Sequence, residues 1–444
     1  MAADTFSFDL ETTSFNALTG RITGFSVAVD TELVPAACVY KCCDTDTMKF
    51  PKAWYFQFVP DLLEHLSYEE AEAGYEQCYP VIATWAAFRE LFACEDKRIV
   101  MHNGKFDLKF AIRAGLEIKN VLIDTAIAAW LLNENRGTQK LKDLVKLFFK
   151  HDMVKFTDLG GLFSPPIALY GADDAAQTLR LWRYLEPMLV KQRMMKVFIE
   201  CECRVARVLA NMELTGALID LDMISEMKST VHAELEEVTL EIYKLAGQEF
   251  NINSNKELAR VLFKDLKWKV FDWARSAKTQ QPSTAKKVLE KFEARQPLAV
   301  ALLRYSELYK IATGYTDPLV IAAKKIDGRI RGKFNQIQDP RGGGGTVTGR
   351  LSASSDNDLG GVNLQTIPSR SETGKKIRYM FVAPEGYKLL CIDYSQVELR
   401  FLAHLSRDKA LVAAYCDWDC FECGEKGSTR LRLFKCPKCG AGAG

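Results

Sequence analysis

The chain has 444 residues, of which 48% are hydrophobic, and its formal net charge is +2. This length predicts two to four domains rather than one, and the apolar share is large enough to form their cores. No apolar stretch is long enough to cross a bilayer and no secretory signal opens the chain, so we predict no membrane partner. Without such a signal, the thirteen cysteines are expected to be reduced thiols or metal ligands.

Charge is distributed unevenly along this nearly neutral chain. Residues 1–100 hold 7 Lys+Arg against 16 Asp+Glu, whereas residues 301–400 hold 15 against 10. A basic region can bind a polyanion through phosphate contacts, although charged surface stretches are also common in soluble proteins of every kind. Charge alone therefore leaves a nucleic-acid partner open.

Strand-like and helix-like stretches alternate over residues 1–190, which predicts an α/β domain. The first strand is FSFDLET, in which apolar residues such as Phe6 and Phe8 alternate with polar ones. Because successive side chains of a strand point to opposite faces, the apolar residues face a core while Asp9 and Glu11 share the other face. A D-x-E pair on a strand also occurs often by chance.

Two later stretches of this region carry acids at helical spacing. In HNGKFDLKFAIRAG, Asn103 and Asp107 are four residues apart, and Asn103 is well suited to cap the helix expected there. In LYGADDAAQTLRLW, Tyr170 and Asp174 have the same spacing on a predicted helix. An isolated N-x-x-x-D start is usually only a cap, and Asp124 in VLIDTA is an equally good candidate acid when taken alone.

Together, Asp9, Glu11, Asp107 and Asp174 could hold two divalent ions, and Tyr170 could position or polarise an attacking water. Two such ions clamp the attacking and leaving oxygens of a displacement at phosphorus. Hard oxygen ligands favour Mg²⁺ or Mn²⁺ over zinc. Taken jointly, in this order and spacing, the five residues indicate a catalytic site for phosphoryl transfer.

FDLETTS, HNGKFDLKF and YGADDAAQTLRLW resemble the three motifs of the DEDD-type 3′→5′ exonucleases, in the subclass with a tyrosine in the third motif. The resemblance implies an RNase-H-like fold and two metals held by the four acids. It also implies that Tyr170 orients the water, that Asn103 lies at the substrate, and that single-stranded 3′ DNA ends are the substrate. Every acid of the pattern and its tyrosine are present.

The following residues, 191–330, are helical in pattern, with segments such as VARVLANMEL and AELEEVTLEIYKL. RVARVLANMELTGALID, FNINSNKELARVLF and ELYKIATGYTDPL resemble the thumb region of the family A DNA polymerases. VTGRLSAS, NLQTIP and IDYSQVELRFLAHLSRD resemble the beginning of that family's palm. The resemblance implies an enzyme of DNA replication and repair in the cytoplasm of a bacterial or phage-infected cell, associated with the nucleoid.

Within KLLCIDYSQVELR, this resemblance implies that Asp393 ends a buried strand and binds catalytic Mg²⁺. Glu398 matches the residue that selects dNTP over NTP, and the neighbouring Gln396 is assigned to the same binding region. Ser395 and Glu398 also have the S-x-x-E spacing of a capping box, so closing a helix start is the alternative role of Glu398.

Contacts to primer–template DNA are implied for the residues just before. Arg350 in TGRLS matches an arginine that reaches the minor groove at the primer terminus, and Asn363 and Gln365 in NLQTIP match residues near the primer–template. Minor-groove acceptors occur on every correct base pair, so such contacts test pairing without reading sequence. Four basic residues are plausible phosphate contacts, with a solvated surface position as the alternative for each: Lys310, Arg331, Lys333 and Arg341.

The sequence departs from the family pattern at its end. Complete family members continue into a fingers helix and a His-Asp-Glu strand, whereas this sequence runs into a tail rich in Cys and Gly. Two C-x₂-C pairs in the tail are typical of a zinc ribbon, in which four thiolates bind Zn²⁺, and four unliganded thiols are the alternative. The predicted zinc ligands are Cys420, Cys423, Cys436 and Cys439.

We therefore expect an RNase-H-like exonuclease domain (1–190), a helical thumb region (191–330), a partial polymerase palm (331–415) and a zinc-ribbon-like tail (416–444). The expected function is the N-terminal portion of a family A DNA polymerase with a proofreading exonuclease and an incomplete polymerase site. A partner chain with the fingers and remaining palm would then be needed before dNTPs could be used. A free-standing exonuclease and a non-catalytic DNA-binding subunit of a split polymerase stay open as alternatives.

Overall fold

A computed structural model gives the structure of the chain. By their contacts, its residues form two compact units, Met1–Val382 and Ala383–Gly444. In the part of the chain that the structure describes, no helix is both long and apolar enough to cross a membrane. The described residues are 4–29, 52–57, 89–159, 166–270, 282–338, 344–356, 358–369, 372–419 and 426–428.

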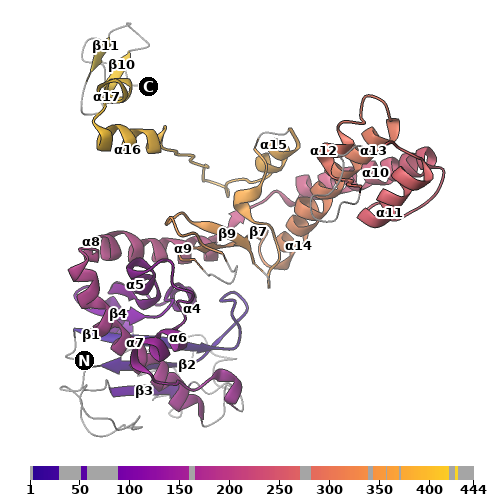
Figure 1. The fold of residues 1–444 in the computed structure, drawn as a ribbon. Helices are drawn as coiled ribbons and strands as arrows, with labels where there is room; N and C mark the ends of the chain where they lie inside the picture. Colours follow the sequence, from indigo (N-terminus) through magenta and orange to yellow (C-terminus); the bar gives the residue numbers. More distant parts are fainter. Residues whose placement is uncertain are drawn as a thin grey trace. The chain divides into compact units, whose positions relative to one another are not determined.

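A mixed five-stranded sheet with the order β3-β2-β1-β4-β5 begins the first unit (Figure 1). The strands β1, β2 and β3 are antiparallel to one another, whereas β4 is parallel to β1 and β5 is parallel to β4. The central strand β1 therefore has a partner on each edge. The strand bounds are Thr5–Thr12 (β1), Ile22–Val29 (β2), Lys52–Gln57 (β3), Arg98–Met101 (β4) and Val121–Asp124 (β5).

Helices pack on this sheet and complete an α/β fold, which confirms the fold class predicted for this region. The longest, α7, contacts β1, β2 and β3. On the face of β1 that points away from α7, Phe6 and Phe8 are at most 2% exposed, and the Phe8 ring meets the ring of Phe92 edge-on at 5.0 Å. The helices are α4 (Lys105–Arg113), α5 (Thr125–Leu132), α6 (Leu141–Phe149) and α7 (Pro166–Lys191), with the short η3 (Phe156–Asp158) between the last two.

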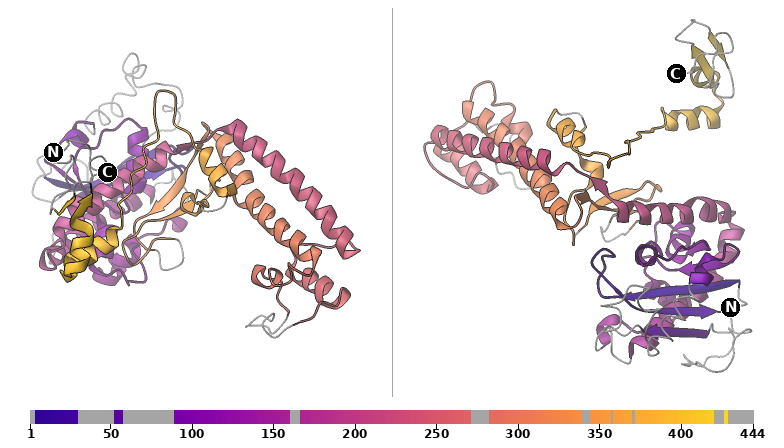
Figure 2. Two further views of the ribbon diagram at one scale, coloured as in Figure 1. Left: turned by 90° about the horizontal axis from the view of Figure 1, so that it is seen from above. Right: turned by 180° about the vertical axis from the view of Figure 1, so that it is seen from behind.

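The predicted helices of the middle region are present. VARVLANMEL lies in α9 (Cys203–Thr215), and AELEEVTLEIYKL lies in α10 (Leu221–Ala246), which runs beside α13 (Pro297–Ile311) (Figure 2). Val238 and Leu302, at most 1% exposed, belong to the core that these two helices share. The other helical segments are α8 (Met195–Val197), η4 (Phe198–Glu202), α11 (Asn255–Ala259), η5 (Arg260–Asp265), α12 (Lys286–Leu289), η7 (Ala312–Thr316) and α14 (Asp317–Lys325).

Short antiparallel ribbons are formed by segments that lie before α10 and after α14. β6 (Ala217–Leu218) pairs with β7 (Arg329–Ile330), and β8 (Gly332–Asn335) pairs with β9 (Ser352–Ser355). A tight turn at Gly216 leads from α9 into β6. Its φ of +63° favours glycine, and a Cβ there would lie 2.9 Å from the carbonyl oxygen of Ile330. The helices η8 (Leu364–Thr366) and α15 (Glu372–Tyr379) complete this part.

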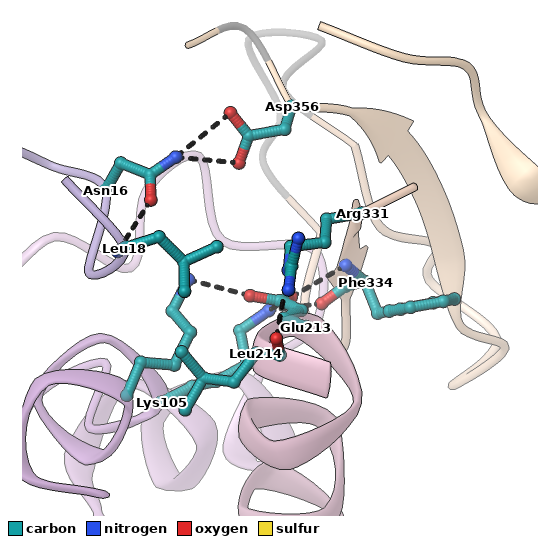
Figure 3. Close-up of polar contacts among 9 residues, drawn as sticks. Asn16, Leu18, Lys105, Glu213, Leu214, Arg331, Phe334 and Asp356 are labelled. Carbon is teal, nitrogen blue, oxygen red and sulfur yellow. Dashed lines mark hydrogen bonds and ion pairs between the residues drawn. The ribbon is translucent and has the colours of Figure 1, made fainter. Parts of the chain in front are cut away.

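A buried carboxylate joins the acid-bearing helix α4 to α9 and β8 (Figure 3). Glu213 on α9 is 6% exposed, and its oxygens lie 2.5 Å from Lys105 Nζ and 2.8 Å from Lys109 Nζ. It also accepts a hydrogen bond from the backbone N–H of Phe334 at 2.8 Å. Burial alone would raise the pKa of Glu213, but the two ammonium groups hold it below its usual value. Glu213 is therefore ionised, and it links α9 to both α4 and β8.

In the second unit, the segment expected to form a buried strand does not form one. Residues 387–394 have no strand assignment, and Leu390, Ile392 and Tyr394 are each more than 80% exposed. A strand is stable only when neighbouring strands satisfy its backbone groups and cover its apolar face. The described residues of this unit include α16 (Val397–Ser406), α17 (Lys409–Cys416), and the paired strands β10 (Asp417–Asp419) and β11 (Lys426–Ser428).

Candidate active site

The strand β1 carries the first two acids toward α7. Ser7 is buried, and its hydroxyl donates a 2.7 Å hydrogen bond to the carbonyl of Ala175 on α7. Because residues two apart on a strand share a face, Asp9 and Glu11 lie on the same side as Ser7. Glu11 is only 8% exposed, although a glutamate in water is ionised at neutral pH. The alternating pattern of FSFDLET thus sets both carboxylates on the α7 side of the sheet.

Helix α4 brings Asp107 to the same strand. The Asp107 side chain is 2% exposed, and its Oδ1 accepts a 3.1 Å hydrogen bond from the backbone N–H of Leu10, between the two acids of β1. The predicted cap is wrong: Gly104 is the N-cap, and no side chain caps the helix. Asn103 lies before the helix with φ at +60°, a conformation that asparagine adopts more readily than most residues. It therefore does not share a helical face with Asp107.

Helix α7 supplies the third part of the site. Tyr170 and Asp174 lie one turn apart on it, and a side-chain hydrogen bond joins them. Asp174 is 8% exposed. Its Oδ1 is buried without a hydrogen-bond partner among the residues that the structure describes. A buried acceptor left in this state is costly, so this oxygen is available to a ligand.

The electrostatics of the four acids are those of a site that is short of positive charge. Burial first, and then the nearby carboxylates, raise the pKa of Asp9 well above its usual value and that of Glu11 to about 8. Burial likewise raises the pKa of Asp107 to about 8 and that of Asp174 to about 7. Four adjacent carboxylates, of which Glu11, Asp107 and Asp174 are buried and Asp9 is partly buried, resist full ionisation unless cations compensate them.

The donor set of this site suits hard divalent cations. Its buried oxygens, including the unpartnered Asp174 Oδ1, are ligands of the kind that Mg²⁺ and Mn²⁺ prefer. Within the described residues, no three side chains of His, Cys, Asp or Glu are already grouped so that they could hold a metal ion. The acids thus match such a cation in chemistry without forming a closed set of ligands.

Asp124, the competing acid, has a structural role instead. It is the N-cap of α5, and its carboxylate accepts hydrogen bonds from the backbone N–H groups of Ala126 and Ile127. It also accepts from the N–H groups of Asn103 and Gly104, at 3.0 and 2.8 Å. Its oxygens are therefore occupied in fixing the start of α5 and the turn before α4.

Lys142 was not singled out by the sequence patterns, yet it lies at this site. Its Nζ is 4.2 Å from the centroid of the Tyr170 ring. Its charge opposes the rise in the pKa of Asp9, Glu11 and Asp174, which burial causes. A lysine in the first turn of an amphipathic helix is usually a surface residue, so the sequence did not indicate that Lys142 would lie at the site.

In the second unit, the residues predicted to form a site around Asp393 lie at the surface. Asp393, Gln396 and Glu398 are all exposed. The proposed capping box is wrong, because α16 has Gln396 as its N-cap, in a left-handed conformation, and no side-chain cap bond. Instead, the Ser395 carbonyl accepts a 2.8 Å hydrogen bond from Arg400 Nε.

Two predicted DNA contacts, Asn363 and Gln365, bond the backbone beside β9. Asn363 caps η8 and donates to the carbonyl of Ala353, while Gln365 accepts from the N–H of Ala353 and donates to the carbonyl of Leu351. Both amides are therefore engaged in fixing β9 to the loop that follows it. Arg350, just before β9, is exposed.

The predicted phosphate contacts differ in their surroundings. Lys310 is exposed on α13, and Lys333 is partly exposed on β8. Arg331 is 6% exposed and binds both oxygens of Asp327 at 2.8 and 2.7 Å, so it is not available to a phosphate in this structure. Five predicted residues lie outside the described part of the chain: Arg341, Cys420, Cys423, Cys436 and Cys439.

Two family profiles match the chain in succession. The profile described as 3'-5' exonuclease matches residues 1–190, and that of DNA polymerase family A matches residues 221–422. The first range contains all four acids of the candidate site and Tyr170. The second contains Asp393 and the exposed segment around it.

Curated relatives and a solved structure agree with these matches. DNA polymerase I of Treponema pallidum is 35% identical over 76% of this chain, and that of Pseudomonas aeruginosa is 30% identical over 93%. The chain covers only 33% and 42% of these two relatives. The POL domain of Pol1 from M. smegmatis, solved with DNA primer-template and dNTP, shares the fold with a TM-score of 0.68. It is 24% identical, over 93% of this chain and 61% of that one. The chain belongs to the family A DNA polymerases and carries a 3'-5' exonuclease domain ahead of its polymerase segment.

Proposed function

We propose that residues 1–190 hydrolyse DNA from single-stranded 3′ ends with the help of Mg²⁺ or Mn²⁺. The observation that carries this proposal is the gathering of Asp9, Glu11, Asp107 and Asp174 on three adjoining elements. Their raised pKa values are those of a site that needs cations. The sheet order β3-β2-β1-β4-β5 supports the RNase-H-like fold that the sequence motifs imply.

The four acids would hold two divalent ions, which would clamp the attacking and leaving oxygens at phosphorus. Tyr170 would orient the attacking water. Burial and the neighbouring Asp174 raise the pKa of its hydroxyl, so the group stays protonated at neutral pH. The hydroxyl donates a hydrogen bond to Asp174, and its oxygen can then accept a hydrogen bond from the water. Asn103, in the turn before α4, would contact the DNA end.

For residues 331–415, we propose a role in holding primer–template DNA, with nucleotide addition only when further polypeptide completes the palm. Asp393 would bind Mg²⁺, and Gln396 and Glu398 would contact the incoming dNTP. The exposure of residues 387–394 supports the proposal that additional strands are needed to cover this segment. DNA contacts are proposed for Lys310, Arg350, Asn363 and Gln365.

The tail and the division of the chain stay predictions of the sequence. We propose that Cys420, Cys423, Cys436 and Cys439 bind Zn²⁺, and that the thumb, palm and tail span residues 191–330, 331–415 and 416–444. The polypeptide that completes the palm would be a partner chain or a further part of the same protein. A free-standing exonuclease is the second candidate function, because the acids of the first site are assembled while Asp393 is exposed.

The decisive experiment uses the 444-residue chain, Mg²⁺ and a single-stranded oligonucleotide labelled at either end. We expect early release of a 3′ label as mononucleotide, with the 5′-labelled strand shortening step by step. The Asp9→Ala, Glu11→Ala double variant should bind DNA but release no label. Cleavage by that variant at the rate of the parent would refute the assigned site.

Primer extension tests the second half of the proposal. With Asp9→Ala to suppress digestion, we expect no template-directed extension by the chain alone in the presence of dNTPs and Mg²⁺. Robust extension would mean that Asp393 already lies in a working site and that the exposed segment is not incomplete.

A further inference from the structure

Lys142 contacts the tyrosine of the candidate site from a neighbouring helix. It is in the first turn of α6, which packs against α7. The ammonium lies 4.2 Å from the centroid of the Tyr170 ring and donates a hydrogen bond to the carbonyl of Val154 at 2.5 Å. The Phe156 ring also meets the Tyr170 ring edge-on, at a centroid distance of 5.9 Å. These contacts limit the orientations open to Tyr170.

The same ammonium faces the acidic groups of the site. Its positive charge favours the ionised forms of Asp9, Glu11 and Asp174, against the burial that raises their pKa values. Lys146, one turn further along α6, provides a contrast. It is 66% exposed, and it pairs with Asp152 at 2.6 Å, away from the four acids.

We propose that Lys142 is a positioning residue of the exonuclease reaction, which holds the Tyr170 ring by a cation–π contact and places a positive charge beside the acids. The proposal rests on the exonuclease function proposed above. The ring contact keeps the Tyr170 hydroxyl next to Asp174, where it can orient water. The charge offsets part of the repulsion among the carboxylates.

These two roles predict opposite effects on metal binding and on turnover. Removing the ammonium leaves the acids more attractive to a divalent cation, so binding should tighten roughly three- to tenfold. Turnover should nevertheless fall about 10- to 100-fold, because a small displacement of an orienting group is costly to the reaction. A residue that only supports the fold would not separate the two quantities in this way.

The test compares Lys142→Met with the matched control Lys146→Met. Affinity for Ca²⁺ is measured by calorimetry without DNA, and kcat and KM are measured with Mg²⁺ and a single-stranded oligonucleotide. We expect tighter Ca²⁺ binding and a lower kcat, with KM nearly unchanged, for Lys142→Met alone. Lys142→Arg should recover most of kcat, because guanidinium also binds over an aromatic ring. Lys142→Gln, which also lacks the charge, would take the place of Lys142→Met if that variant failed to fold.

A double-mutant cycle with Tyr170→Phe asks whether the charge acts through the hydroxyl. In the Tyr170→Phe background, Lys142→Met should lower kcat less than twofold. An equal loss in both backgrounds, or a kcat within twofold of the parent, would overturn the proposal. If the parent chain proved inactive, the exonuclease function would fail first, and unchanged Ca²⁺ affinity in Lys142→Met would then reject the charge assignment independently.

Discussion

The strand β1 and the segment 387–394 have similar sequence patterns, but only β1 forms a strand in the structure. Each is an apolar stretch with a carboxylate, Asp9 in the first and Asp393 in the second. β1 is paired on both edges and covered by α7, and its acids lie near enough to Asp107 and Asp174 for their charges to interact. The segment 387–394 has no strand assignment and is exposed. A carboxylate at a strand becomes a site only when the elements that surround it are present.

The largest expected effect separates the two carboxylate sites directly. Asp107→Asn should lower exonuclease activity roughly 10²–10³-fold, because it removes a charge from the acids proposed to bind metal without changing their packing. Asp393→Asn should leave this activity unchanged. Label release from single-stranded DNA measures both, and a comparable loss in the two variants would contradict the separation.

A second effect concerns the link between α4 and the polymerase segment. Glu213→Ala leaves two lysines without their buried partner and should cost about 3 kcal/mol or more of stability. Glu234, which pairs with Arg304 at 3.4 Å with both side chains nearly half exposed, is the control. Its alanine variant should cost at most about 1 kcal/mol. Urea denaturation followed by tyrosine and tryptophan fluorescence compares them, and equal midpoints would show that Glu213 does not stabilise the link.

The pH dependence of stability is the next test of the acidic site. The folded pKa values of Glu11 and Asp107 are about 8, above the usual values near 4. In this range the folded state binds more protons than the unfolded state, so stability falls as pH rises from about 4.5 to 8. We expect the melting temperature in EDTA to fall across this window and to recover when Mg²⁺ is added at pH 8.

The variant that removes part of this repulsion is the control for the pH effect. Asp107→Asn should be less sensitive to pH in EDTA than the parent, because one of the titrating groups is gone. A melting temperature that rises steadily from pH 4.5 to 8 without metal would contradict the electrostatics of the site.

A smaller effect is expected for the acid that only supports the fold. Asp124→Ala removes the cap of α5 and the acceptor for the turn before α4, and should cost about 1–3 kcal/mol. Denaturation midpoints measure this loss. Exonuclease activity below the unfolding transition should remain measurable, and complete inactivation of a well-folded variant would assign Asp124 to the site itself.

The sequence was informative where local pattern and tertiary packing agree. Period-two alternation in FSFDLET and the four-residue spacing of Tyr170 and Asp174 predicted the elements that carry the acids. Asn103 departed from its predicted capping role because the turn before α4 places it in a left-handed conformation and Asp124 accepts its N–H. No local pattern distinguishes a cap such as Asp124 from a metal ligand, since both are buried carboxylates.

Other features depended on contacts between distant residues. Lys142 meets Tyr170 across 28 positions of sequence, and Glu213 meets Lys105 across 108. No periodic pattern in the sequence predicts either of these two contacts. The strand expected at Asp393 was predicted from its apolar run alone, but strand formation also needs neighbours, which the run cannot report.

Amide hydrogen exchange of the 444-residue chain tests the contrast between β1 and the segment 387–394 most directly. Peptides covering Thr5–Thr12 should exchange slowly, because both edges of β1 are hydrogen-bonded within the sheet. Peptides covering residues 387–394 should exchange within seconds, because this segment has no strand partner among the described residues. Equal, strong protection of the two segments would contradict the account and would place Asp393 in a formed sheet.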